Sequence, residues 1–170
     1  EGAATTRKVA KEMLRTSRQP RDRSERMIFN NYITMRRIVD LRDKPLSKQL
    51  LLEIHEIITQ GTLDSPNEAG RFRNTREPVK VYDDENEILH IPPSASELEW
   101  RVEALCAFAN GETPDTFVHP AIRSIVLHFW LAYDHPFVDG NGRVARTLFY
   151  WSMLKHKYWP LEYLSISEIL

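Results

Sequence analysis

The sequence contains one cysteine among its 170 residues, and this scarcity excludes several kinds of site. A single thiol, Cys106, cannot form a disulfide within the chain and cannot bind zinc without other ligands. The histidines show none of the spacings typical of a zinc site. We expect Cys106 to be a small buried apolar residue, and a lone free thiol favours a reducing, cytoplasmic compartment.

Long hydrophobic runs and an excess of either charge are also missing. No apolar run approaches the roughly 20 residues that a membrane helix requires, and no signal peptide pattern is present. The formal net charge is −1 and the isoelectric point is about 6.7, so the chain has no overall basic field. We therefore expect no membrane partner, and nucleic acid is not the expected partner of these residues.

The length and composition are those of one globular domain covering residues 1–170. Hydrophobic residues make up 42% and charged residues 28% of the chain. The first residue is Glu1 rather than Met, and Ser165 and Glu168 form an S-x-x-E pattern that opens helices close to the end. The domain is accordingly expected to be truncated at both ends.

Most of the chain shows the apolar spacing of amphipathic helices. The expected helices cover residues 6–15, 24–41, 47–61, 94–110, 119–133 and 141–157. The stretch 119–133 is apolar almost all round, which predicts a helix at the centre of a bundle. The fold class is therefore mainly α, a helical bundle.

Residues 70–93 have a different character and predict a β-hairpin. Two β-prone runs, Val79–Tyr82 and Glu87–Ile91, flank the turn-forming residues 83–86, and Pro92 and Pro93 end the segment. The hairpin is expected to project from the helical bundle.

The loop HPFVDGNGRVAR, residues 135–146, holds the chemistry of the chain. Gly140, Asn141 and Gly142 stand at a predicted helix N-terminus, where free N–H groups and the helix dipole attract anions. Glycines there let a ligand approach the backbone closely. This half of the loop predicts a phosphate cradle.

Four charged or titratable side chains complete the loop. Arg143 and Arg146 lie on the first helical turn and can hold a phosphate chain by bidentate contacts. Asp139 would repel phosphate unless a magnesium ion bridged the two. His135 can accept a proton near neutral pH. Each residue alone has an ordinary structural explanation, and their coincidence is what indicates catalysis.

These twelve residues resemble the signature of the Fic (filamentation induced by cyclic AMP) family, H-P-F-x-[DE]-G-N-G-R-x-x-R, at every specified position. Residues 70–81 and 90–99 are similar to the family's flap hairpin and the helix after it. The resemblance implies a Fic-type helical bundle whose hairpin flap covers the loop. It also implies an enzyme that transfers AMP from ATP, with Mg²⁺, to a Ser, Thr or Tyr hydroxyl of a target protein.

The resemblance also assigns roles to the loop residues. His135 would be the catalytic base, Asp139 would hold the magnesium ion, and Arg146 would bind the γ-phosphate. The nucleotide-binding and phosphate-binding set would be Gly140, Asn141, Gly142, Arg143 and Arg146. The target protein would dock on the flap, beside Val79, Val81 and Ile91, by pairing with a strand edge.

Many Fic proteins carry an inhibitory motif, [ST]-x-x-x-E-[GN], whose glutamate pairs with the second arginine of the signature. Glu1 and Gly2 resemble the last pair of that motif. The resemblance thus implies that Glu1 opposes Arg146 and inhibits transfer by competing with phosphate.

Other readings stay open at this point. Within the enzyme class they are transfer of UMP or phosphocholine, or removal of AMP. From a different class, the chain could be a regulatory module of a DNA-binding protein, or an adaptor without activity. Assembly as a homodimer is also open.

Overall fold

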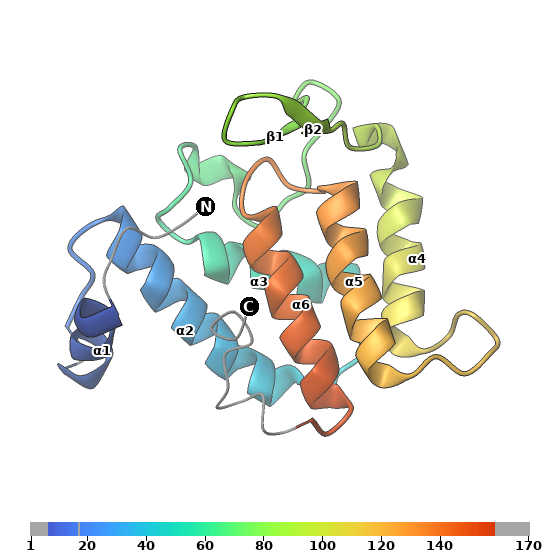
Figure 1. The fold of residues 1–170 in the computed structure, drawn as a ribbon, viewed down its shortest axis with the longest axis horizontal. Helices are drawn as coiled ribbons and strands as arrows, with labels where there is room; N and C mark the ends of the chain where they lie inside the picture. Colours follow the sequence, from blue (N-terminus) through green and yellow to red (C-terminus); the bar gives the residue numbers. More distant parts are fainter. Residues whose placement is uncertain (1–6, 17, 159–170) are drawn as a thin grey trace.

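The computed structural model describes residues 7–16 and 18–158, which form a helical bundle with a hairpin above it (Figure 1). Glu1 and the Ser165–Glu168 pattern lie outside the described residues. The helices are α1 (Arg7–Thr16), α2 (Arg23–Leu41), α3 (Lys48–Thr59), α4 (Leu98–Asn110), α5 (Pro120–Asp134) and α6 (Asn141–Lys155), with short 3-10 turns η1 (Pro66–Glu68) and η2 (Ala95–Glu97). The predicted fold class is confirmed.

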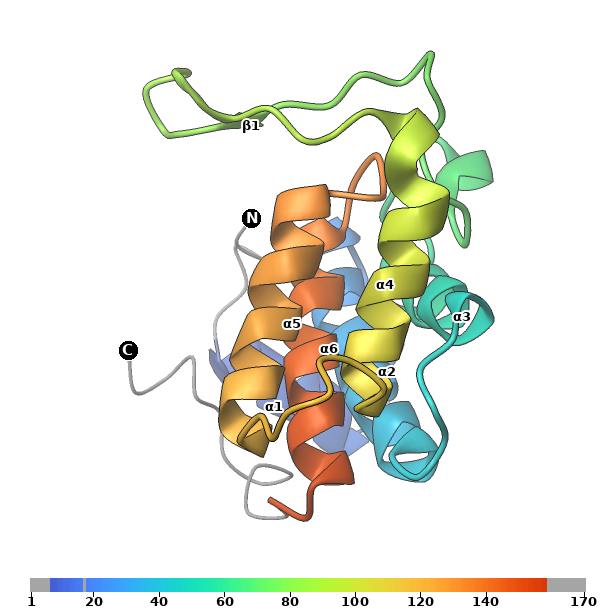
Figure 2. The ribbon, with the colours of Figure 1, turned by 90° about the vertical axis from the view of Figure 1, so that its right-hand side faces the viewer.

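Helix α6 is the buried centre of the bundle, packed against α5, α2 and α3. Its inward residues Val144, Ala145, Leu148 and Trp151 are fully buried. Because the helix is enclosed on several sides, polar residues such as Thr147 and Ser152 are buried on it as well. Figure 2 shows α5 and α6 side by side, with the loop that joins them at the end beneath the hairpin.

The ends of the helices follow local chemistry. The Ser47 hydroxyl accepts a hydrogen bond from the Leu50 N–H and starts α3, and Asp22 does the same for Glu25 at the start of α2. Gly111, with φ of 83°, ends α4 in the left-handed conformation. These are the boundaries that the sequence pattern predicts to within a few residues.

The predicted hairpin is present, with strands shorter than expected. β1 (Val81–Tyr82) pairs antiparallel with β2 (Ile88–His90). The Asp83 carboxylate accepts hydrogen bonds from the N–H groups of Glu85 and Glu87, which organises the turn. The hairpin extends as an arm above the α5–α6 loop (Figure 2).

The prediction that 119–133 lies at the centre of the bundle is wrong for one face of α5. Ile122, Ile125 and Phe129 are 53%, 44% and 68% exposed, and Val126 and Tyr133 lie beside them in the same open strip. Only the opposite face, with Leu127 and Leu131, is buried. The apolar pattern correctly indicated a hydrophobic helix. It did not indicate which face of α5 the other described residues cover.

The apolar spacing within residues 24–41 predicts a buried face of α2 that includes Tyr32 and Ile38. Ile38 is buried as predicted, whereas Tyr32 is 38% exposed. Polar residues occupy the buried face instead: the Asn30 amide donates to the Ile58 and Gln60 carbonyls at the end of α3.

Among the residues described, no helix is both long and apolar enough to cross a membrane.

Candidate active site

The loop 135–146 turns sharply at two left-handed residues and faces the hairpin across a cavity. His135 has φ of 47° and ends α5, and Gly140 has φ of 85° and precedes α6. The cavity has a volume of about 780 Å³. It is lined on one side by Pro78, Val79, Lys80, Val81 and Tyr82 and on the other by His135, Val138, Asp139, Gly140, Asn141, Gly142 and Arg146.

The His135 side chain is held in one orientation and has a basic nitrogen left for chemistry. Its Nδ1 lies 3.1 Å from the Ala132 carbonyl oxygen, which fixes Nδ1 as the N–H that donates. The tautomer therefore leaves Nε2 as the acceptor. Burial, the largest effect, and the cationic Arg73 lower the pKa of His135 below its ordinary value, while the hydrogen bond to the Ala132 carbonyl opposes them. His135 is thus neutral, and able to accept a proton, at neutral pH.

Asn141 closes the loop internally. Its side-chain oxygen accepts from the Phe137 N–H at 2.9 Å, and its side-chain nitrogen donates to the Phe137 carbonyl at 2.8 Å. The residue is 2% exposed. Because the amide is fixed by both bonds within the loop, Asn141 holds Phe137 in place at the N-terminus of α6.

Asp139 and Arg143 form an ion pair behind the rim of the cavity. Arg143 Nη2 lies 3.1 Å from Asp139 Oδ2, and its Nη1 donates to the Thr62 hydroxyl at 3.0 Å. Arg143 is 7% exposed, and its buried Nε has no hydrogen-bond partner among the described residues. Arg143 therefore does not line the cavity itself. It contacts Asp139, which does.

Arg146 is exposed and lines the cavity, unlike Arg143. Its Nη1 lies 3.8 Å from the position that a Cβ at Gly142 would occupy. The guanidinium group thus lies beside the first turn of α6, where the free N–H groups are. The two arginines that the sequence predicts to act side by side are separated into one buried and one open group.

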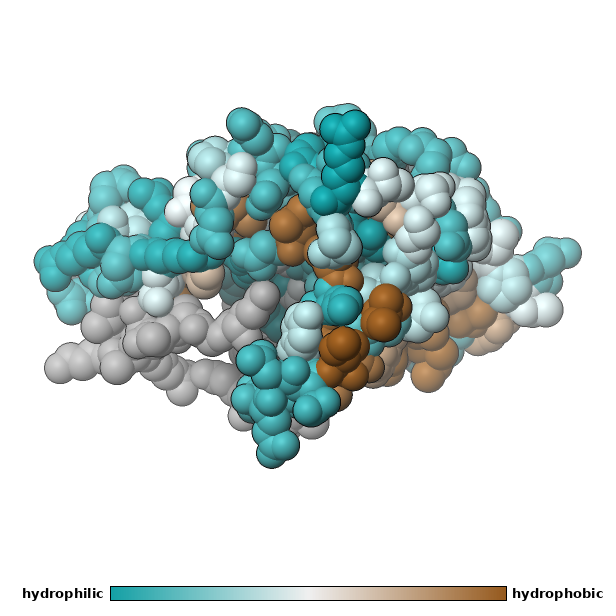
Figure 3. Space-filling model, turned by 90° about the horizontal axis from the view of Figure 1, so that it is seen from above, coloured by the Kyte–Doolittle hydropathy of each residue, from teal (hydrophilic) through white to brown (hydrophobic). Residues whose placement is uncertain are grey.

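The three predicted flap residues differ in whether they line the cavity. Val79 and Val81 line the cavity opposite His135. Ile91 is 65% exposed and is not among the residues that line it. Seen from the flap side, this face is mainly hydrophilic with a few apolar side chains among the polar ones (Figure 3).

Two residues outside the signature hold the loop, and the sequence pattern did not single out either for this task. His55 of α3 stacks on Phe137 with ring centroids 3.8 Å apart. Arg73 donates from Nε to the His135 carbonyl at 2.8 Å. Each lies more than 60 positions from its partner. No local signal could have revealed such contacts.

Asp139 is the residue that fits a magnesium ion. Its carboxylate is 29% exposed at the cavity wall, beside the N-terminus of α6. Mg²⁺ is commonly held by one or two carboxylates together with substrate phosphates and water. No group of three His, Cys, Asp or Glu side chains suited to a metal occurs in the described part of the chain. The donor set suits an ion that arrives with a nucleotide.

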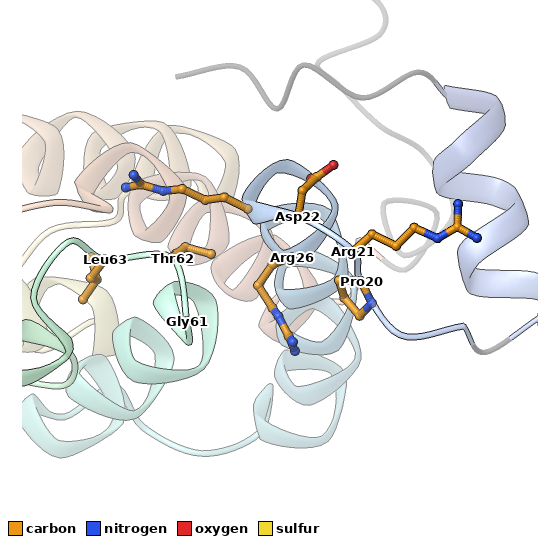
Figure 4. Close-up of a pocket in the computed structure, with 8 residues that line it drawn as sticks. Pro20, Arg21, Asp22, Arg26, Gly61, Thr62 and Leu63 are labelled. Carbon is orange, nitrogen blue, oxygen red and sulfur yellow. The ribbon is translucent and has the colours of Figure 1, made fainter.

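A second hollow of about 290 Å³ lies between the start of α2 and the turn after α3 (Figure 4). Arg21, Arg23 and Arg26 line it, and the side chains of Arg21 and Arg26 point in different directions. It contains no loop residue and no candidate base. Of these two hollows, the cavity under the flap is therefore the one that contains His135 and the loop residues.

Comparisons with known proteins find a matching family and similar sequences. The sequence profile of the Fic/DOC family matches residues 45–153. The protein adenylyltransferase Fic of Nematostella vectensis is 37% identical over 98 residues, which cover 58% of this chain and 20% of that protein. The Drosophila melanogaster protein of the same name is 33% identical over 111 residues, covering 65% of this chain and 20% of that protein. The chain spans about a fifth of the length of these curated relatives.

Solved structures share the fold. A Fic domain containing signaling protein from Bacteroides thetaiotaomicron superposes with a TM-score of 0.78 at 21% identity, covering 92% of this chain and 59% of that one. A Fic family protein from Desulfovibrio desulfuricans gives 0.74 at 25% identity, covering 95% of this chain and 46% of that one. The overall fold is thus shared with these two structures.

Proposed function

Because the chain belongs to the Fic/DOC family, we propose that it is a protein adenylyltransferase, which transfers AMP from ATP to a hydroxyl group of a target protein. The curated relatives with this name support the proposal. The observation that carries it is the cavity, where the neutral base His135 and the N-terminus of α6 face the same space as the flap strand.

The reaction would divide between the two halves of the loop. His135 Nε2 accepts the proton of the target hydroxyl as its oxygen attacks the α-phosphorus of ATP. The new oxygen–phosphorus bond forms while the bond from the α-phosphorus to the bridging oxygen breaks, and pyrophosphate leaves. Backbone N–H groups of Gly142 and Asn141 and the dipole of α6 stabilise charge on the phosphate oxygens.

Arg146 and Asp139 would orient the nucleotide. Arg146, open to the cavity, contacts the terminal phosphate, while Arg143 holds the Asp139 carboxylate in place. Magnesium held at Asp139 would supply neutralisation of the phosphate charge. The carboxylate is partly exposed, so it remains accessible to an incoming ion.

The flap would hold the target. Main-chain pairing along β1 fixes an extended segment whatever its sequence, and Val79 and Val81 border the slot opposite His135. Ile91, outside the cavity lining, would contribute only at the outer side of the hairpin.

Glu1 would act as an inhibitor of the same site. A carboxylate paired with Arg146 competes with the terminal phosphate for its N–H donors. Replacing Glu1 with Gly should then raise transfer in a protein that retains its native upstream residues. Equal rates for the two forms would reject this role.

The test is labelling of protein with ATP that carries its label at the α-phosphate and, in parallel, at the γ-phosphate, in the presence of magnesium. The acceptors are the purified chain itself and a cell lysate. Label from the α position, lost in His135→Ala, is the expected result. His119→Asn, which keeps an N-cap residue at the start of α5, is the matched control and should retain labelling. Label from the γ position alone would mean a kinase and reject the proposal.

A further inference from the structure

Arg73 is a buried arginine whose guanidinium group is used on backbone carbonyls of three residues. Its Nε donates to the His135 carbonyl at 2.8 Å, and its Nη2 donates to the carbonyls of Pro93 at 2.6 Å and Asp134 at 3.2 Å. The backbone N–H of Arg73 donates to the Pro136 carbonyl at 2.9 Å. The residue is 6% exposed, so these bonds are made with little competition from water.

The contacts satisfy a strained helix end. The last carbonyls of α5 have no partner within the helix, and the negative end of the helix dipole attracts a cation. His135 adopts φ of 47°, a conformation that a residue with a side chain reaches only when its surroundings hold it there. The planar fork of Arg73 supplies several fixed donors at this point, which the single ammonium of a lysine would not reproduce.

The Arg73 side chain also joins the segment before the flap hairpin to the segment after it. Arg73 precedes β1 in the chain, and Pro93 follows β2. The hydrogen bond from Arg73 to the Pro93 carbonyl therefore joins the two ends of the flap segment. The same guanidinium group also donates to the carbonyl of His135. A further link from the hairpin to α5 is the His90 ring, whose Nε2 lies 2.7 Å from the Tyr133 carbonyl.

We propose that Arg73 is a positioning residue that sets the distance and orientation between the flap and His135. This inference rests on the proposed transfer to a target held by the flap. The base is useful only when the target hydroxyl meets Nε2, and an error of about 1 Å in such placement costs on the order of 100-fold in rate. Arg73 touches neither the nucleotide cradle nor Arg146, so it acts on the target side of the reaction.

The experiment compares Arg73→Lys and Arg73→Gln with Arg71→Lys as the matched control. Arg71 belongs to the same segment, but its guanidinium pairs with Glu77 and not with the catalytic turn. The measurements are amide hydrogen exchange, ATP binding by titration calorimetry, and transfer of α-label to the chain itself. All variants are first checked by thermal unfolding.

Both Arg73 variants should increase exchange roughly 10-fold or more at residues 78–91 and 135–137 while α2 and α3 keep wild-type protection. Transfer should fall on the order of 10- to 100-fold with ATP affinity changed less than about twofold. The control should match the wild type in all three measurements. Unchanged exchange at the flap and the turn, or a parallel loss of ATP affinity, would overturn the proposal.

The two proposals fail separately. If the wild type transfers no label, the proposed function fails, and exchange still decides whether Arg73 couples the flap to the turn. If Arg73→Lys were too unstable to study, Arg73→Gln, which keeps a donor without charge, gives the same comparison. Retained transfer in a folded Arg73 variant rejects the positioning role even when the enzyme is active.

Discussion

The imidazole ring of His55 lies parallel to the ring of Phe137, with an interplanar angle of 3° and centroids 3.8 Å apart. Its Nδ1 accepts the Gly70 N–H at 3.1 Å, which leaves Nε2–H to donate to the Asp139 carbonyl at 3.0 Å. One neutral ring from α3 thus joins the start of the flap segment to Phe137 and Asp139 in the loop 135–146. If the ring were protonated, Nδ1 would carry a hydrogen and could no longer accept the hydrogen bond from the Gly70 N–H.

This arrangement makes stability depend on pH. Burial of the ring lowers the pKa of His55 to about 4, below the ordinary value of 6.5. The unfolded chain therefore binds more protons than the folded one between these values, so stability is complete above about pH 6.5 and declines as the pH falls toward 4. His55 alone should contribute a loss of about 3 kcal/mol by pH 4.

Denaturant unfolding at pH 7.5, 5.5 and 4.5 measures this loss. His55→Gln cannot titrate, so it should be less stable than the wild type at pH 7.5 but less sensitive to acid. The pKa values of His128 and His156 are also lowered and act in the same direction in both proteins. The difference between the two curves therefore isolates His55, and parallel curves would contradict the prediction.

Gly140→Ala should destabilise the loop for two reasons. The residue has φ of 85°, and an added Cβ would lie 2.7 Å from the Thr59 methyl group. Gly111 has φ of 83° with nothing within 4 Å of an added Cβ, so Gly111→Ala reports the backbone strain alone. We expect Gly111→Ala to cost on the order of 1–2 kcal/mol and Gly140→Ala to cost more. Equal losses in denaturant unfolding would mean that the contact with α3 relaxes freely.

The rate of transfer should rise with pH through the titration of His135. The base acts in its neutral form, and burial places the pKa of His135 below its ordinary value. The acidic limb of kcat/KM should therefore lie below about pH 6.5, with a plateau at neutral pH. A pH–rate profile of α-label transfer measures it. An acidic limb above pH 7 would show that another group titrates.

Asp139→Asn should reduce transfer on the order of 100-fold and shift the magnesium dependence to higher concentrations, since the neutral amide is a weaker ligand. Loss of the Arg143 partner adds to the effect. Transfer rates across a magnesium titration test this, with Asp115→Asn in an exposed loop as the control. A proportional loss at every magnesium concentration would assign Asp139 to holding Arg143 alone.

The loop could be predicted from the sequence because its residues are neighbours in the chain. His135, Asp139 and Gly140–Gly142 face the cavity that the pattern implied. The supports of the loop could not be predicted, since the contacts of His55 and Arg73 join segments more than 60 residues apart. Separation of Arg143 from Arg146 depends on where α3 ends, because Thr62 draws the Arg143 guanidinium inward.

Helical periodicity located α2 and α5 and misjudged which faces are covered. Apolar spacing records that a side chain avoids water and not which segment covers it, so Ile122 and Phe129 were expected inside. Asn30 and Thr34 are buried on α2 because their side chains bond to backbone carbonyls, and sequence patterns treat such residues as surface.

The open strip along α5 has a practical consequence for handling the protein. A contiguous exposed apolar face of this kind favours association with other apolar surfaces, including further copies of the chain. Phe129 lies on this strip, 68% exposed, and contributes nothing to the lining of the catalytic cavity. We expect Phe129→Lys to reduce self-association at high concentration without changing any residue that lines the cavity under the flap.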